Sequence, residues 1–410
     1  MALIVQKYGG TSVGSIERIR NVARRCLAAQ REGNDVVVIV SAMSGETNRL
    51  LGLAHSVTPI PDAREMDAIA ATGEQVCAAL TALAIHNEGG RARSLLGHQI
   101  KVVTDDAFTK ARIKTIDGSK IFATLKNGEI AVVAGFQGVD RDGNITTLGR
   151  GGSDTSAVAI AAAIKADACE IYTDVDGVYT TDPTICPSAR KIDKISFEEM
   201  LELASLGAKV LQIRSVEIAM KYEVPVHVRS AFSDVPGTWV TNEDSSLEEV
   251  VVAGVAYEKN DARVHIVGID DRPGVVADLF GQIAEKNISV DMIIQSATTE
   301  SRANVTFTVP KTDLARAKPF LEEIGKALGA REVRYDEDVV KVSIVGLGMR
   351  SHAGVAAKAF RFLANEGINI QAISTSEIKI SCLIAAKYTE LAVRALHDGF
   401  GLHRAKGCTP

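Results

Sequence analysis

The chain has 410 residues, of which 46% are hydrophobic and 24% charged, and this composition argues against disordered, collagen-like and fibrous proteins. At about 150 residues per domain, the length predicts two to three folded domains. Lysine and arginine number 46 against 51 acidic residues, for a net charge of −5. Because the basic residues form no block, the sequence does not indicate binding to nucleic acid or to an anionic membrane.

The first half of the chain alternates short β-branched runs with longer helical patterns. Strands are predicted at residues 3–6, 36–41, 130–136, 170–173 and 225–230, and helices from residue 15 and at 46–57, 64–87, 157–166 and 197–221. This alternation predicts a mostly parallel sheet that helices cover. The turn-rich segments DVPGT and NEDSS follow the last strand and place a domain boundary near residue 247.

The second half contains an internal repeat. VHIVG at 264–268 matches VSIVG at 342–346, and GVVADLF at 274–280 matches GVAAKAF at 354–360. Short strand–turn–helix units can look alike by chance, but this match extends through a strand, a turn, a helix and a second strand. The pattern predicts two copies of a small βαββαβ module.

The cysteines indicate no metal site and no disulfide framework. They form no CxxC pair, and no Cys/His group has the spacing of a zinc site, so we expect reduced, mostly buried thiols. The apolar run at the N-terminus is too short for a signal peptide, and no 18 uninterrupted apolar residues occur. We therefore expect a cytoplasmic protein. The six cysteines are Cys26, Cys77, Cys169, Cys186, Cys382 and Cys408.

Two glycine-rich loops lie where a predicted strand gives way to a helix. In the first, KYGGTS at 7–12, glycines allow the backbone to approach an anion, and Lys7 adds a full charge. A tight turn with a surface lysine is the alternative. In the second, LGRGGSD at 148–154, the fork of Arg150 suits a carboxylate or phosphate, while Asp154 could serve only as a helix N-cap.

A third loop, TDVDGVYTTDP at 173–183, directly follows a strand. Its DxDG resembles the start of a calcium-binding loop, but Ile185 stands where that loop needs a glutamate. Ordinary Asx turns explain part of it. Walker A and protein-kinase motifs are absent, and Gly346-Leu-Gly348 continues without the third glycine of a dinucleotide fingerprint. Any nucleotide site therefore belongs to another fold.

The chain resembles the aspartate kinase family along nearly its whole length. Six motifs carry the resemblance in the family's order: KYGGTSV at the start, VSAMSGETN at 40–48, TGE at 72–74, GRGGSDTSA at 149–157, TDVDGVYTTDP at 173–183 and GAKVLQIRSVE at 207–217. The duplicated module resembles tandem ACT domains, which bind regulatory amino acids. The resemblance implies an α/β amino-acid-kinase domain with three αβα layers at 1–247, followed by ferredoxin-like ACT domains at 248–337 and 338–410.

The activity implied is phosphorylation of the side-chain carboxylate of L-aspartate by ATP with Mg²⁺, giving 4-phospho-L-aspartate for lysine, threonine, methionine and isoleucine synthesis. Such a carboxylate has a pKa of about 3.9 and needs no general base, so the missing Ser/His/Asp triad is expected. Kinases of the same fold for acetylglutamate, glutamate or UMP, and a catalytically inactive amino-acid sensor, are the alternatives. Lys7, Arg150, Asp154 and Lys209, all intact here, argue against the sensor.

The resemblance also implies roles for individual residues. Lys7 and Asp154 correspond to catalytic residues, Arg150 to a clamp on the α-carboxylate of aspartate, and Glu74 to the partner of its α-ammonium group. Further substrate-binding positions are Ser41, Thr47, Gly151, Gly152 and Ser153. Nucleotide-binding positions, besides Lys7 and Ser153, are Gly9, Gly10, Ser12, Thr173, Asp174, Tyr179, Asp182 and Lys209.

The ACT-like half implies feedback regulation. Many family members have His-Pro where this chain has Gln212-Ile213, and this difference, with the length, resembles the shorter subgroup regulated jointly by threonine and lysine. The quaternary state implied is a homodimer, or an α₂β₂ form with a shorter regulatory subunit. Effector contacts are expected at Asp271, Gly274, Ala277, Gln295, Asn369, Ile370, Ser376 and Glu377, although each could be only a turn, cap or strand end.

Overall fold

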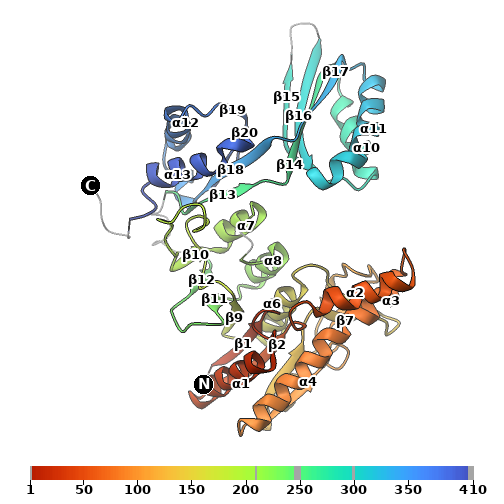
Figure 1. Cartoon of the computed structure of the whole chain (residues 1–410), viewed down its shortest axis with the longest axis vertical. Coiled ribbons are helices and arrows are strands. Elements are labelled where there is room, and N and C mark those ends of the chain that lie inside the picture. The colour runs from red at the N-terminus through yellow and green to blue at the C-terminus, as the bar shows by residue number, and fades with distance from the viewer. Residues whose placement is uncertain (1, 208–209, 244–250, 298–300, 405–410) are drawn as a thin grey trace. The chain divides into compact units, whose positions relative to one another are not determined.

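The structure, a computed structural model, describes residues 2–207, 210–243, 251–297 and 301–404. The chain divides into two compact units (Figure 1), each described here by itself. The N-terminal unit comprises Met1–Val178, Lys191–Ser205 and Lys209–Leu247, and the C-terminal unit comprises Tyr179–Arg190, Leu206–Ala208 and Glu248–Pro410. The segment Tyr179–Arg190 thus packs with the C-terminal unit, although it precedes the expected boundary at residue 247.

An eight-stranded, mostly parallel sheet forms the centre of the N-terminal unit. Its order is β10-β12-β11-β9-β1-β2-β6-β3, and among its pairs only β11–β12 is antiparallel. The β-branched run Asp35–Val40 is buried on both faces, as a strand between two helical layers requires. The strands are β1 Leu3–Tyr8, β2 Asp35–Val40, β3 Ala92–Leu95, β6 Ile130–Ala134, β9 Ala168–Thr173, β10 Lys194–Ser196, β11 Val226–Ser230 and β12 Thr238–Thr241.

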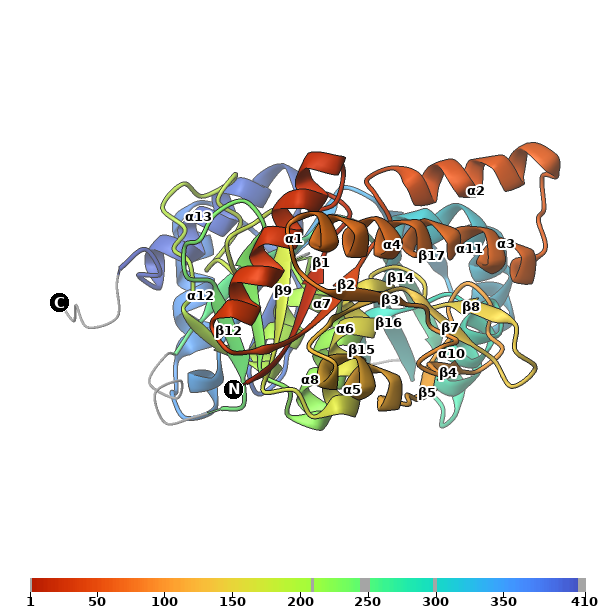
Figure 2. The ribbon, with the colours of Figure 1, turned by 90° about the horizontal axis from the view of Figure 1, so that it is seen from below.

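Helices cover both faces of this sheet (Figure 2). Helices α1 (Ile16–Arg31) and α4 (Thr72–Asn87) pack on one face, and α5 (Ser119–Lys126) and α6 (Gly152–Ile164) pack on the other. Helix α8 (Ile213–Tyr222) contacts α6. This arrangement confirms the predicted three-layer αβα fold.

Two predicted helices are each a pair of helices. The pattern at 64–87 forms α3 (Ala63–Ala70) and α4, separated at Ala71. The pattern at 197–221 forms α7 (Phe197–Ser205) and α8, and Gly207 in between has a φ of 100°, which a helix cannot include. Helix α2 (Glu46–Val57) has the predicted bounds.

The sequence did not predict a second, small sheet in this unit. Its order is β5-β4-β7-β8, and each strand has only two or three residues, too few for an alternating pattern to be visible. The strands are β4 Val103–Thr104, β5 Ile113–Thr115, β7 Gln137–Val139 and β8 Ile145–Thr147.

Within the described residues, one helical stretch, Ala63–Asn87, is long and apolar enough to cross a membrane. Half of its apolar window is buried inside the protein, and it includes the buried carboxylates Asp67 and Glu74. Buried core helices of water-soluble proteins pass the same test, so this stretch is weak evidence for a membrane span.

The first copy of the repeat in the C-terminal unit has the predicted βαββαβ order, and its sheet order is β15-β16-β14-β17. Gly274 forms the N-cap of α10 with a φ of 92°, and Gly354 forms that of α12 in the second copy with a φ of 85°, so the turns are equivalent. The elements of the first copy are β14 Asp261–Asp270, α10 Val275–Glu285, β15 Asp291–Ala297, β16 Arg302–Pro310, α11 Lys311–Ala327 and β17 Glu332–Asp336.

The second copy differs from the predicted order in its last strand. Its sheet order is β13-β18-β20-β19, and β13 (Gly254–Glu258) comes from the chain before the first copy. Strand β13 pairs antiparallel with β18 as β17 pairs with β14, so it occupies the edge that a strand after α13 was expected to fill. The other elements are β18 Val339–Val345, η1 Leu347–Arg350, α12 Val355–Asn365, β19 Ile370–Thr375, β20 Lys379–Ala385, η2 Ala386–Tyr388 and α13 Thr389–Gly399.

Candidate active site

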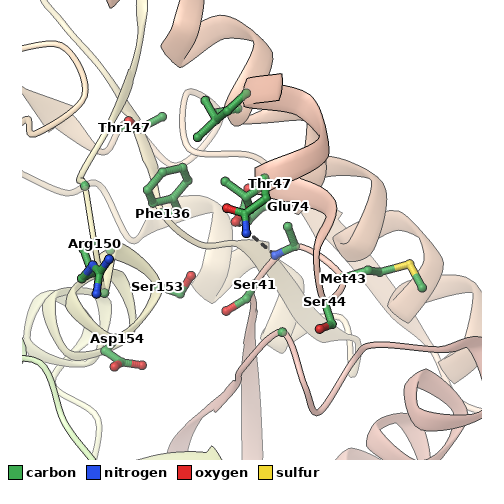
Figure 3. A pocket seen from close by; sticks show the side chains of 18 of the residues that line it. Ser41, Met43, Ser44, Thr47, Glu74, Phe136, Thr147, Arg150, Ser153 and Asp154 are labelled. Carbon is green, nitrogen blue, oxygen red and sulfur yellow. Dashed lines mark hydrogen bonds between the residues drawn. The ribbon is translucent and has the colours of Figure 1, made fainter. Parts of the chain in front are cut away.

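A cavity of about 770 Å³ lies in the N-terminal unit where β1, β2 and β6 end. Open α/β sheets bind ligands at the carboxyl ends of their strands, where connections leave in opposite directions. Strand β1 is such a point, because β2 and β9 flank it. The predicted residues that line the cavity are Lys7, Gly10, Ser41, Thr47, Glu74, Arg150, Gly151, Gly152, Ser153 and Asp154, and Figure 3 shows most of them from close by.

An ion pair joins the two predicted catalytic residues. Lys7 lies near the end of β1, Asp154 lies in the first turn of α6, and the lysine Nζ is 2.5 Å from the aspartate Oδ1. Only about a tenth of either side chain is exposed, 10% and 12%, so water screens the pair weakly. Gly151 is the N-cap of α6, so the alternative that Asp154 is only the N-cap is wrong.

The first glycine loop approaches neighbouring backbone closely. A Cβ atom on Gly10 would lie 3.0 Å from the carbonyl oxygen of Ala42, so a side chain there would need the chain to shift. The Gly9 N–H donates to the Tyr172 carbonyl at 3.3 Å. Ser12 Oγ is buried and has no hydrogen-bond partner among the described residues. Such a hydroxyl is available to a ligand that reaches the loop.

The second glycine loop is held by α8. The guanidinium of Arg214 donates to the carbonyl oxygens of Leu148 at 2.6 Å and Ala111 at 3.0 Å. Gly151 has a φ of 70°, and a Cβ atom there would overlap Gln212, 1.8 Å from its Cγ. The loop therefore has little freedom, and it presents the exposed Arg150 at the cavity.

Glu74, in the first turn of α4, presents an unsatisfied carboxylate to the cavity (Figure 3). One oxygen accepts the N–H of Ala42 at 3.0 Å, and Oε2 is buried without a hydrogen-bond partner in the part of the chain that the structure describes. Burial raises the pKa of this carboxyl to about 7, although the hydrogen bond from Ala42 opposes the shift. A bound cation would restore the carboxylate's ionised form.

The predicted nucleotide-binding residues do not all lie together. Thr173 ends β9, and its hydroxyl donates to the exposed Asp174 at 3.0 Å. Tyr179 and Asp182 belong to the C-terminal unit, where Asp182 accepts hydrogen bonds from the Thr184 backbone and the Tyr257 hydroxyl, both at 2.9 Å. Lys209 lies outside the described residues. Thr173, Asp174, Tyr179 and Asp182 do not line the cavity, and neither do Gly9 and Ser12.

The sequence interpretation missed several residues at this site. Phe136 follows β6 with a φ of 68°, and its position at the carboxyl end of a central strand could have revealed it. Arg214 was quoted within a motif but given no role. The further cavity residues that were missed include Met43, Ser44, Asn48, Met66, Phe136 and Thr147.

The predicted effector residues fall into two groups, one in each copy of the repeat in the C-terminal unit. In the first copy they lie on the turn before α10, in α10 and on β15. In the second copy they lie at the start of β19 and on the turn between β19 and β20. All are exposed except Ile370, which is half-buried. The first group is Asp271, Gly274, Ala277 and Gln295, and the second is Asn369, Ile370, Ser376 and Glu377.

Comparison with known families agrees with this organisation. The sequence matches the Amino acid kinase family over residues 2–230 and the ACT domain twice, over 266–329 and 342–400. It is 55% identical over 404 residues to an aspartokinase of Pseudomonas aeruginosa, with 98% of each chain covered. It is 52% identical over 408 residues to an aspartokinase of Helicobacter pylori, with 98% of this chain and 99% of that protein covered.

Two solved structures of E. coli aspartokinase III have a similar fold. The R-state complex with aspartate and ADP has a TM-score of 0.81 at 27% identity, and it covers 97% of this chain and 99% of its own. The T-state complex with lysine and aspartate has a TM-score of 0.78 at 25% identity with the same coverage. Because the sequence likeness to aspartokinases extends over 98% of the chain at 55% identity, the chain belongs to the aspartate kinase family.

Proposed function

We propose that this ATP-using kinase phosphorylates L-aspartate in the cavity at the ends of β1, β2 and β6. One observation carries the assignment: the cavity combines the Lys7–Asp154 ion pair with Glu74 and Arg150. A carboxylate without a partner suits the ammonium group of an amino acid, and a guanidinium suits its α-carboxylate. The side-chain carboxylate of aspartate then faces the lysine that neutralises the transferring phosphoryl group.

The arrangement suits a reaction that needs positioning more than proton transfer. The aspartate side chain is already ionised near neutral pH, so its carboxylate attacks the γ-phosphorus of ATP directly while the bond to the ADP oxygen breaks. Lys7 stabilises the charge that spreads over the phosphoryl oxygens. Asp154 holds the lysine Nζ in place, and the N-terminus of α6 adds backbone N–H groups that favour anions.

The residues at this site also fit a magnesium ion. Mg²⁺ prefers oxygen ligands and is usually held by one or two carboxylates together with substrate phosphates. Asp154 and the exposed Asp174, which follows β9 beside β1, offer such oxygens. When bound, the ion would neutralise phosphate charge. We assign the remaining nucleotide contacts within the N-terminal unit to Gly9, Gly10, Ser12, Ser153, Thr173 and Lys209, and the remaining aspartate contacts to Ser41, Thr47, Gly151 and Gly152. Tyr179 and Asp182 belong to the C-terminal unit and are given no part in this site.

A coupled assay of ADP release tests the substrate. We expect turnover with aspartate and none above background with glutamate or acetylglutamate, because both have a side chain one methylene longer than that of aspartate, and acetylglutamate has no ammonium group to pair with Glu74. UMP serves as a further control substrate. Release of ADP with any of these three but not with aspartate would overturn the assignment, and no turnover with any substrate would favour an inactive sensor.

The C-terminal unit is proposed to be the feedback module, with domain limits near 248–337 and 338–410, except that β13 (Gly254–Glu258) joins the sheet of the second domain. The two ACT matches support this role, and the T-state relative was solved with lysine. Threonine and lysine are the proposed effectors, at the two groups of residues described above. Strands β15 and β19 are the edges of their sheets, contact each other within the unit, and expose Ile293 and Ile373. The proposed quaternary state is a cytoplasmic homodimer or an α₂β₂ form with a shorter subunit, in which these exposed apolar side chains take part in the pairing.

A further inference from the structure

Four side chains that can bind a transition metal gather at the end of α13 in the C-terminal unit. Cys186 Sγ lies 3.5 Å from His397 Nδ1, and that nitrogen lies 3.5 Å from Asp398 Oδ1. The ligand atoms of these three residues all lie within 4.8 Å of one another. His403 Nδ1 is 3.8 Å from the same Asp398 oxygen. We propose that Cys186, His397, Asp398 and His403 bind one zinc-class metal ion.

The turn after α13 places three of these side chains together. Gly401 has a φ of 69°, a conformation that glycine adopts without strain, and its N–H donates to the Asp398 carbonyl at 3.0 Å. The Leu402 N–H donates to the His397 carbonyl at 3.0 Å. Because the chain changes direction at this turn, the centre of the His403 ring lies 6.4 Å from the centre of the His397 ring.

Cys186 reaches the cluster from a distant part of the chain. It lies in the segment Tyr179–Arg190, where its N–H donates to the Asp182 carbonyl at 3.0 Å. More than two hundred residues separate it from His397. The rule that zinc ligands occur at short, regular spacings therefore gave no indication of the cluster.

Two of the separations already match a tetrahedral ion. Bonds of about 2.0–2.3 Å from zinc to nitrogen, oxygen and sulfur place each nitrogen about 3.3–3.5 Å from the other ligand atoms, and His397 Nδ1 lies 3.5 Å from both Cys186 Sγ and Asp398 Oδ1. The Cys186 and Asp398 ligand atoms are within 4.8 Å of each other, and His403 Nδ1 is 3.8 Å from the Asp398 oxygen, so the exposed side chains of Asp398 and His403 would turn inward when the ion binds. A thiolate with imidazole ligands selects zinc or a similar ion over Mg²⁺ or Ca²⁺. A simple thiol–imidazole hydrogen bond accounts for Cys186 and His397 but leaves the convergence of the other two side chains unexplained.

The hydrogen bond and the burial of His397 are typical of a histidine that binds a metal ion. His397 Nε2 lies 3.0 Å from the hydroxyl oxygen of Thr180, which also accepts the Arg190 N–H at 3.0 Å. Metal-binding histidines commonly hold their second ring nitrogen in such a hydrogen bond, which leaves the first nitrogen free for the ion. Cys186 and His397 are buried, whereas the side chains of Asp398 and His403 are 63% and 37% exposed. An ion can therefore enter from the exposed side.

Bound metal would tie the segment Tyr179–Arg190 to α13. Cross-linking two distant segments in this way is what structural zinc sites do, and their binding free energy adds to folding stability. The proposed zinc ligands share no residue with the proposed magnesium ligands, which are oxygen atoms in the N-terminal unit.

Cobalt titration of the full-length protein tests the proposal. The reduced protein is first freed of metal with a chelator and then titrated with Co²⁺ under anaerobic conditions. We expect one Co²⁺ per chain, with the visible bands of a tetrahedral ion and a sulfur-to-cobalt charge-transfer band, and displacement by Zn²⁺. Cys186→Ser should lose the charge-transfer band. Cys382→Ser, a substitution at another buried free thiol of the same unit, should keep it.

Two further variants test the exposed ligands without removing buried groups. Asp398→Asn and His403→Gln should each weaken Zn²⁺ binding, measured by competition with Co²⁺, by about tenfold or more. His352→Gln, at an exposed histidine of the same unit, should leave it unchanged. The proposal is overturned if the folded wild-type protein, checked by circular dichroism, binds no stoichiometric Co²⁺. A charge-transfer band that survives Cys186→Ser, or that Cys408→Ser removes, would also overturn it.

Discussion

Glu74 is the residue whose chemistry depends most on its burial. Its carboxyl pKa is raised from 4.5 to about 7 by desolvation, so the free protein holds it ionised only above that pH. The proposed partner, the ammonium group of aspartate, binds the ionised form. Lowering the pH below 7 therefore protonates Glu74, and the ammonium group of aspartate loses its carboxylate partner. Raising the pH above 7 changes the affinity for aspartate little, because Glu74 is already mostly ionised.

Steady-state kinetics across this pH range measure that dependence. We expect the KM for aspartate to rise about tenfold for each pH unit below 7, as for a single ionisation, while the KM for ATP changes little. Glu74→Gln should raise the KM for aspartate at pH 8 and abolish its pH dependence. An unchanged pH profile in Glu74→Gln would show that another group titrates.

The Lys7–Asp154 pair permits a second test at the residue scale. Lys7→Ala removes the proposed stabilisation of the transferring phosphoryl group, so we expect kcat to fall by about 10²–10³. Asp154→Asn should lower kcat less, because the lysine remains but is less well held. If the two act as one unit, the double variant should be scarcely slower than Lys7→Ala. Full additivity of the two effects would contradict a shared role, and unchanged activity of Lys7→Ala would misplace the phosphoryl site.

At the scale of elements, α8 fixes the glycine loop that precedes α6. Arg214 alone holds two carbonyl oxygens of neighbouring segments, and its planar fork makes both contacts at once, which a lysine cannot imitate. Arg150 lies two residues beyond one of these carbonyls. The position of Arg150, the proposed clamp on the α-carboxylate, therefore depends on a helix that does not line the cavity.

Arg214→Lys should consequently raise the KM for aspartate about tenfold, since a charged hydrogen bond contributes about 1.5–3 kcal/mol, and it should change kcat less. The control is Arg24→Lys on α1, where the native side chain makes a largely exposed ion pair with Glu88. We expect that control to match the wild type. If the KM for ATP rose as much as the KM for aspartate, the substitution would have disrupted the whole site and not only displaced the loop.

At the scale of the whole molecule, the sequence predicted the layers and the repeat but not every connection. Runs of β-branched residues, such as those in Asp35–Val40, predicted the strands of the parallel sheet. The glycine loops predicted the carboxyl ends of strands at which the cavity forms. The pairing of β13 with β18 depends on a free sheet edge that no local pattern reveals. Likewise, the contacts of Arg214 and the approach of Cys186 to His397 join segments far apart in sequence.

Feedback inhibition is the property to measure on the whole enzyme. We expect threonine and lysine together to lower activity at limiting aspartate, with a coupling of about 1–3 kcal/mol between sites, or about 5–150-fold in affinity. Gln295→Ala and Asn369→Ala, one in each copy, should each raise the effector concentration needed for half inhibition. Activity that is flat with both amino acids, singly and together, would leave the ACT pair as a dimerisation device.

The origin of β13 also sets an order in which the chain can fold during synthesis. Domains generally fold as units, N-terminal ones first, as the ribosome releases them. Gly254 is made before any part of the first copy, yet its partner Val345 is made after all of it. The first copy can therefore fold while β13 is still unpaired. A chain that is truncated within the second copy would contain a folded first copy and a strand β13 that has no partner strand.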